Sequence, residues 1–177
     1  MAIVTTVSGG ERAGCLIGFH TQCSIDPPRY AIWLSKANHT FRVALHARYF
    51  AVHFLSEMST ELPRLFGTTS GDTTQKFAWC DWEDGPDGVP LLTSCPNRFV
   101  ATRVTLLDDG SDHVCVVLSP TEVAANAFQP LRLSQVAGLQ PGHDADERPE
   151  PPTERAAALH ETPSRDPGAL LSWSNES

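Results

Sequence analysis

The sequence has no long apolar segment. Among its 177 residues, no apolar run approaches the roughly 18 residues that a membrane-spanning helix requires. The N-terminus also lacks the charged region followed by an apolar stretch that is typical of a secretory signal peptide. We therefore expect neither a membrane span nor a signal peptide.

Several short catalytic and nucleotide-binding motifs are also missing. There is no G-x-G-x-x-G segment and no P-loop, so neither a Rossmann fold nor an NTPase is indicated. A G-x-S-x-G nucleophile elbow is absent and no Cys–His pair stands out, which leaves a nucleophilic triad without support. The cysteines form no C-x-x-C pair, which argues against a thiolate zinc site or a dithiol redox centre. A nucleotide-like cofactor would have to be held in another way.

Basic residues are in deficit, with 13 Lys and Arg against 21 Asp and Glu and a formal net charge of −8. Because nucleic-acid binding favours a basic surface, this balance and a pI near 5.2 argue against a nucleic-acid partner. The five cysteines are odd in number and lie in apolar or strand-like surroundings. This pattern is typical of reduced, mostly buried thiols, so we expect a cytoplasmic protein.

What the chain does contain is a series of β-branched and alternating segments. We predict strands at residues 2–7, 14–20, 30–34, 49–55, 91–107, 113–118 and 131–139. Apolar residues at helical spacing predict short helices near residues 41–45, 57–66 and 72–79. Turn-forming residues predict a surface loop at 82–90 and a turn at 108–110, across which the flanking strands form a hairpin. Six or seven strands with few helices indicate one domain, a small antiparallel barrel with helices at its rim.

The composition changes near the C-terminus. Residues 141–177 hold six of the 14 prolines and eight of the 21 acidic residues, but one aromatic, Trp173. Such a segment buries too little apolar surface to offset the entropy lost on ordering. We therefore predict a folded domain over residues 1–143 and a disordered, acidic, Pro-rich tail over 144–177. Docking of Leu170, Leu171 and Trp173 on a partner is the alternative for this tail.

The most distinctive stretch is GCLIGFHTQCSIDPP at residues 14–28, which we call the lip. Gly14 and Gly18 leave the backbone open to close approach by another molecule. Small or polar groups follow at residues 20–24, and two prolines then end any strand because proline has no N–H to donate. From the residues alone, a ligand-binding lip and a structural strand both stay open.

The bend at residues 35–40 precedes a predicted helix. Unpaired N–H groups and the helix dipole attract anions to a helix N-terminus, and the side chains of Ser35, Lys36, Asn38 and Thr40 add donors. An ordinary N-cap beside an exposed lysine is the alternative. Because one predicted strand joins the lip to this bend, the two could flank one crevice.

Histidines are the remaining candidates for chemistry. His20 lies in the lip and His113 opens a predicted strand, so each could contact an anionic or amide-bearing ligand or be a plain strand-end histidine. His39, His46 and His53 recur at spacings of seven, but no carboxylate completes a metal set. We therefore predict no metal site.

The order and spacing of several short motifs resemble the flavin reductase family, whose members have the FMN-binding split-barrel fold. The resemblance runs from Ala2 to His143. Its motifs are AIVTT at residues 2–6, Gly14 followed by SIDPP at 24–28, LSK at 34–36 with Thr40, FAVHFL at 50–55, LFG at 65–67, KF at 76–77, GVPL at 88–91 and Asp112-His113. It implies a mainly β fold, a six-stranded antiparallel split β-barrel of Greek-key type with short flanking helices.

This resemblance also implies a function. The expected protein is a homodimer that holds FMN or FAD in a groove between subunits and passes a hydride from NADH or NADPH to flavin N5. His113 would be the catalytic residue on the nicotinamide side, and reduced flavin would pass to a partner monooxygenase. The implied cofactor-binding residues are Leu16, Ile17, Gly18, His20, Gln22, Cys23 and Ser24 around the ring, and Ser35, Lys36, Asn38 and Thr40 around the phosphate.

The lip departs from the family at three positions. Members usually carry Thr, Asn and Ser where this chain has Leu16, Gly18 and Phe19. Because those hydrogen-bonding side chains are gone, we expect backbone contacts, together with His20 and Gln22, to carry the recognition. The departure leaves as an alternative a split-barrel module that binds a flavin, a deazaflavin or haem without nicotinamide turnover. A third alternative is a protein–protein module that acts through the acidic tail.

Overall fold

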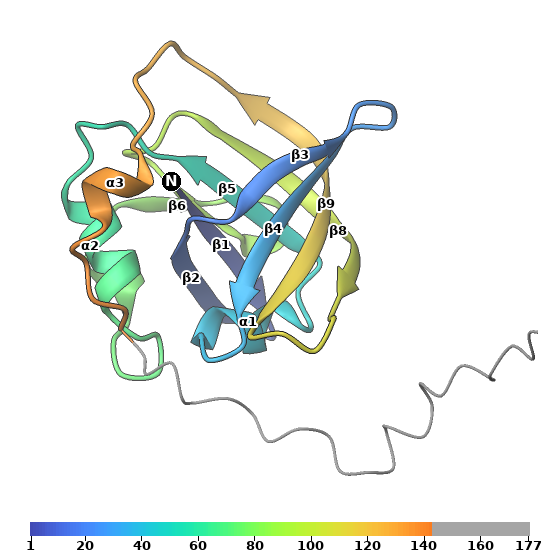
Figure 1. The fold of residues 1–177 in the computed structure, drawn as a ribbon, viewed down its shortest axis with the longest axis horizontal. Coiled ribbons are helices and arrows are strands. Elements are labelled where there is room, and N and C mark those ends of the chain that lie inside the picture. Colours follow the sequence, from blue (N-terminus) through green and yellow to red (C-terminus); the bar gives the residue numbers. More distant parts are fainter. Residues whose placement is uncertain (143–177) are drawn as a thin grey trace, which may run out of the picture.

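The computed structural model describes residues 1–142. The predicted tail at residues 144–177, with its docking alternative, lies outside the described residues. Strands and short helices follow one another along the chain (Figure 1). In order they are β1 (Ala2–Ser8), β2 (Glu11–Ile17), β3 (His20–Ser24), β4 (Arg29–Ser35), α1 (His39–Ala44), β5 (Tyr49–Phe54), α2 (Glu61–Thr68), η1 (Lys76–Ala78), β6 (Trp82–Asp84), η2 (Pro86–Gly88), β7 (Pro90–Leu92), β8 (Arg98–Leu107), β9 (His113–Ala124) and α3 (Leu133–Val136).

Seven strands form one antiparallel sheet in the order β2-β1-β5-β8-β9-β4-β3, and β6 and β7 pair separately. The two edge strands, β2 and β3, are consecutive in the chain and are joined by Gly18 and Phe19 alone. Because the three steps from Ile17 to His20 span at most about 11 Å, the sheet must curl until its edges come close together. This confirms the predicted mainly β split barrel with short flanking helices.

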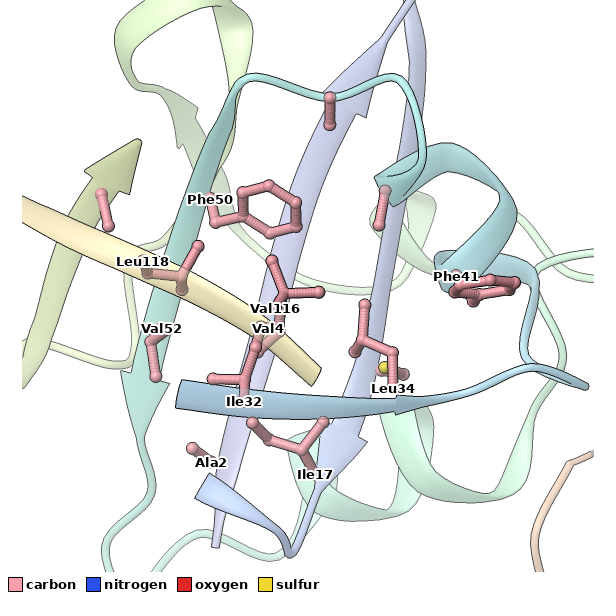
Figure 2. Packing of buried hydrophobic residues seen from close by; sticks show 14 of the residues in the cluster. Ala2, Val4, Ile17, Ile32, Leu34, Phe41, Phe50, Val52, Val116 and Leu118 are labelled. Atoms are coloured by element: carbon pink, nitrogen blue, oxygen red, sulfur yellow. The ribbon is translucent and has the colours of Figure 1, made fainter. Parts of the chain in front are cut away.

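The barrel has a core on each side of β1. Inside the curl, fully buried Val4, Ile32 and Phe50 pack together with side chains from β9 (Figure 2). On the other face of β1, Ile3 packs with Phe66 from α2 and with other buried apolar residues. Both faces of β1 are therefore covered, which explains why its sequence opens with a continuous apolar run rather than an alternation.

Two predicted segments have the expected form. Strand, short helix and strand occur as β4, α1 and β5, and the hairpin of β8 and β9 pairs from Arg98 with Ala124 to Leu107 with Cys115. The single strand predicted at residues 14–20 is instead broken between β2 and β3. The chain has to turn there to pass from one sheet edge to the other, and this adds a strand to the six that the resemblance implied.

Three other predictions were wrong in detail. The predicted strand at residues 91–107 is interrupted between β7 and β8, where Cys95 N–H donates to Leu92 O in a turn and Pro96 has no N–H for a ladder. The helix predicted at residues 72–79 is reduced to η1, because the N–H groups of Thr73 and Thr74 both donate to Ser70 O in a turn. The predicted loop at 82–90 contains β6 and η2.

The last strand predicted, at residues 131–139, was also wrong. Pro130 forms an isolated bridge with Ser56, and Leu131 N–H donates to Leu55 O at 2.8 Å. The chain then turns into α3, where Gln135 Oε1 accepts from Arg132 N–H. Apolar residues in this segment recur every three positions, which suits a helical turn and not a pleated strand.

Candidate functional site

One cavity of about 400 Å³ is surrounded by segments far apart in the chain. They are the β2–β3 link, the bend between β4 and α1, the start of β9, the end of α2 and the segment that contains α3. Seven of the twelve site residues predicted from sequence line it, which means that the fold brings the lip and the bend to one place. These seven are Leu16, Ile17, Gly18, Ser35, Lys36, Asn38 and His113.

The proximal half of the lip, of which residues 15–19 line the cavity, forms one of its walls. Phe19 O accepts a hydrogen bond from Trp33 N–H at 3.0 Å, which fixes the β2–β3 link against β4. The Phe19 side chain is 60% exposed, and its ring lies edge-on to the His113 ring with centroids 5.4 Å apart. The aromatic residue that departs from the family pattern therefore contacts the predicted catalytic histidine.

The distal half of the lip lies elsewhere. His20, Gln22, Cys23 and Ser24 belong to β3 and do not line this cavity. His20 Nδ1 lies 2.7 Å from Tyr30 Oη, and burial lowers the pKa of the imidazole. Gln22 Nε2 donates to Ser24 O, and the Cys23 side chain faces solvent. Their predicted contact with a cofactor stays a prediction.

The bend supplies polar groups to the same cavity. Lys36 Nζ lies 2.7 Å from Asp108 Oδ1, and this hydrogen bond lowers the pKa of the Asp108 carboxyl. Asn38 is the N-cap of α1, since its Oδ1 accepts from Thr40 N–H at 3.0 Å. Thr40 itself is 1% exposed and lies behind the cavity wall.

His113 stands where the bend and the β8–β9 hairpin meet. It pairs with Ser35 across the β4–β9 ladder, and its Nδ1 lies 3.1 Å from Asp112 Oδ1. Lys36 N–H donates to Asp112 O at 2.9 Å, so the turn before β9 is held against the bend. These hydrogen bonds thus join the bend directly to the turn that precedes His113.

Sequence reasoning missed several residues that line the cavity. Trp33 and Phe66 contribute aromatic rings from β4 and α2, and the C-terminal part of the domain contributes an apolar wall that includes Leu133, Val136 and Leu139. The three-residue spacing of these side chains indicates a helical turn and is the signal that could have identified this wall, in place of the predicted strand at residues 131–139. The ring of Phe66 comes within reach only through packing of α2 on β2, which no local pattern specifies.

The other histidines lie apart from this cavity. His39 opens α1 and contacts Glu11 Oε1 at 3.1 Å and Asp72 Oδ1 at 2.9 Å. His53 is fully buried in β5, where its ring contacts backbone groups. In residues 1–142, no group of three or more His, Cys, Asp or Glu side chains has a geometry that could hold a metal ion. No helix of the described part is long and apolar enough to cross a membrane.

Comparison with known proteins assigns the fold to a family. Residues 1–135, most of the chain, match the model of the flavin reductase like domain. The chain belongs to the flavin reductase family. It is 30% identical over 118 residues to a Rhizobium meliloti protein named "Probable flavin reductase", covering 64% of this chain and 37% of that one.

Two further proteins are similar. The protein named "FMN reductase (NADH) SmoA" from Agrobacterium fabrum is 28% identical over 134 residues, covering 76% of this chain and 74% of that one. The solved structure of the Streptomyces globisporus NADH:FAD oxidoreductase SgcE6 superposes with a TM-score of 0.65 at 23% identity, covering 73% of this chain and 78% of that one. The chain thus spans much less than two thirds of the Rhizobium relative and most of the Agrobacterium one.

The residues around the cavity fit the flavin that this family name implies. A flavin mononucleotide combines a flat, largely apolar ring with a charged phosphate. Phe19, Trp33 and Phe66 give the cavity aromatic walls, while Ser35, Lys36 and Asn38 give it hydrogen-bond donors. In a flavin reductase domain the first set suits the ring and the second the phosphate.

Proposed function

We propose that this chain is a flavin reductase that transfers a hydride from NADH or NADPH to FMN or FAD. One observation carries the proposal. In a member of the flavin reductase family, residues 16–19 of the lip, the bend and His113 line a single cavity. The name of the Agrobacterium relative supports FMN and NADH as the first pair to test.

Different residues of the chain then bind different parts of the flavin and the nicotinamide. Lys36, Ser35 and Asn38 hold the phosphate by charge and hydrogen bonds, and the backbone at Leu16–Phe19 approaches the ring. His113, placed by Asp112 and by the Phe19 ring, bounds the side at which the nicotinamide enters. The apolar walls exclude water from the reacting rings, and the bound flavin supplies the hydride-accepting chemistry.

A substitution at Lys36 tests the phosphate assignment. Lys36→Met should weaken FMN binding about tenfold, because charge-assisted hydrogen bonds contribute about 1.5–3 kcal/mol. Riboflavin, which has no phosphate, is the matched control and should bind Lys36→Met and the natural chain equally well. Equal losses for both ligands in a fluorescence titration would show that Lys36 does not meet the phosphate.

Binding without turnover is the second candidate, and the apolar lip favours it. Leu16, Gly18 and Phe19 offer no side-chain hydrogen bonds to position a ring for hydride transfer. In that case the protein would bind a flavin, a deazaflavin or haem but would not accelerate loss of nicotinamide absorbance in a steady-state assay with FMN. Turnover with either nicotinamide would remove this candidate.

The assembly and location belong to the proposal as well. We infer a homodimer because β8 and β9 expose the large apolar side chains Val104, Leu107 and Val123, which a subunit interface would cover. Light scattering that gives the mass of one chain would contradict it.

All five cysteines lie in the described part and each is free, which supports a reducing compartment such as the cytoplasm. The resemblance adds a monooxygenase as receiver of the reduced flavin, and a pull-down with candidate oxygenases tests this.

A further inference from the structure

The last part of the domain, residues 131–142, crosses the cavity as a strap. Its start is anchored twice. Leu131 N–H donates to Leu55 O at 2.8 Å, and the N-terminal ammonium of Met1 donates to Leu131 O at 2.7 Å. From there the chain passes through α3, whose Val136 belongs to the same apolar cluster as Phe66 of α2, and the strap ends at Gly142 (Figure 1). The strap therefore has a fixed beginning and a longer part that lies against other elements.

The side chains that the strap turns inward are apolar. Leu133, Val136 and Leu139 line the cavity together with the lip and the end of α2. Ideal Cβ positions at Gly18 and Gly67 would lie within 4 Å of Leu133 and Leu139, respectively. Leu133 is nevertheless 60% exposed, a large value for a leucine that lines a cavity. The strap thus presents open apolar surface to whatever the cavity holds.

The far end of the strap is fixed by a close backbone approach. A Cβ at Gly142 would lie 2.5 Å from the carbonyl carbon of Thr69 and 2.8 Å from the Ser70 nitrogen. A side-chain movement could not relieve this contact, because the neighbouring atoms belong to the backbone of Thr69 and Ser70. Only glycine lets the strap close on the loop after α2. Gly138, four residues earlier, has nothing within 4 Å of its ideal Cβ position.

We propose that the strap is a wall of the flavin site, in which Leu133, Val136 and Leu139 pack against the ring while Gly142 holds the wall closed. The inference rests on the proposed flavin reductase function. A ligand with one charged end and one flat apolar ring matches both the polar bend and this apolar wall. The strap accordingly contributes ring affinity and shields the ring from solvent.

Two glycine variants of the full chain test the inference. Gly142→Ala should push the strap off the loop, weaken FMN binding about tenfold and raise iodide quenching of the bound flavin's fluorescence. Gly138→Ala is the matched control, with the same chemical change and room for the methyl group, and should stay within about twofold of the natural chain. Hydrogen exchange at residues 133–142 without flavin should rise in Gly142→Ala only.

A third variant separates contact from closure. Leu139→Ala keeps Gly142 but removes part of the wall, so it should weaken both FMN and riboflavin about tenfold, unlike a phosphate-site variant. Unchanged FMN affinity and iodide quenching in both Gly142→Ala and Leu139→Ala would overturn the inference while leaving the flavin reductase proposal intact. A natural chain that binds no flavin would overturn both.

Discussion

At the scale of single residues, His53 acts as a neutral strut between strands. Its ring is fully buried, its Nε2 accepts from Leu92 N–H at 3.0 Å, and its Nδ1 lies 3.3 Å from Ile3 O. These partners require the proton on Nδ1 and a bare Nε2. Burial lowers the pKa of His53 from 6.5 to about 3. The folded state therefore resists the protonation that the unfolded chain accepts.

This strut predicts a loss of stability in mild acid. Between pH 6.5 and 3 the unfolded chain binds the His53 proton and the folded chain does not, so the free energy of unfolding falls as the pH falls. From pH 7 to pH 5 the loss attributable to His53 is about 2 kcal/mol. Urea unfolding of His53→Gln at both pH values should show a correspondingly smaller difference. An unchanged difference would contradict the neutral strut.

Lys76 is a buried cation with backbone partners. Its Nζ donates to Gly14 O at 3.0 Å and to Phe66 O at 3.4 Å, and burial lowers the pKa of the ammonium. The side chain thereby links the edge strand β2 to the last turn of α2, where carbonyls lack helical partners. Both linked elements border the cavity.

Removing this link should destabilise the fold. Lys76→Met leaves two buried carbonyl groups without a donor, and the free energy of unfolding should drop by about 1–3 kcal/mol. Lys36→Met, which removes a partly exposed lysine from a surface ion pair, serves as the control and should cost less than about 1 kcal/mol. Equal effects in chemical denaturation would mean that the buried link contributes nothing special.

At the scale of elements, the contact of α2 with β2 depends on Gly14. A Cβ there would lie 2.8 Å from the Phe66 ring and 3.0 Å from Val4 O, whereas one at Gly18 would meet nothing closer than 3.7 Å. Gly14→Ala should therefore lower the free energy of unfolding by about 1–3 kcal/mol, while Gly18→Ala should be nearly neutral. Thermal unfolding of the two variants compares them directly. Similar midpoints would refute the close packing.

Local pattern explains which elements the sequence could predict. The β8–β9 hairpin and the β4–α1–β5 unit depend on alternation, helical spacing and turn residues, all of which are visible in a short window. The break after Ile17 and the turn into α3 depend instead on which sheet edge the chain must reach. That requirement exists only once the barrel is closed.

The same distinction holds for the site. The proximal lip, the bend and His113 could be placed together because one strand joins the lip to the bend and because the family resemblance covers all three. His20 was expected at the cavity, but the register of β3 on β4 sets it opposite Ile32 and beside Tyr30. The wall at Leu133, Val136 and Leu139 comes from tertiary packing, which a single sequence does not show.

At the scale of the whole molecule, the cavity lies at the place where the two edges of the sheet meet. The sheet closes between its edge strands through a two-residue link, and the cavity opens beside that link. The lip, the bend, His113 and the strap meet there from four parts of the chain. A barrel of this kind provides a fixed frame in which two flat rings can be brought face to face with little rearrangement.

The central claim is that this frame promotes hydride transfer to flavin, and an anaerobic single-turnover experiment tests it most directly. Protein and FMN are mixed rapidly with NADH, and in parallel with NADPH, and the loss of the oxidised flavin absorbance is followed. Alignment of the rings should accelerate reduction at least about a hundredfold over a protein-free sample with one of the donors. The rate should also saturate with protein concentration. Reduction no faster than in the protein-free sample with both donors would contradict the claim.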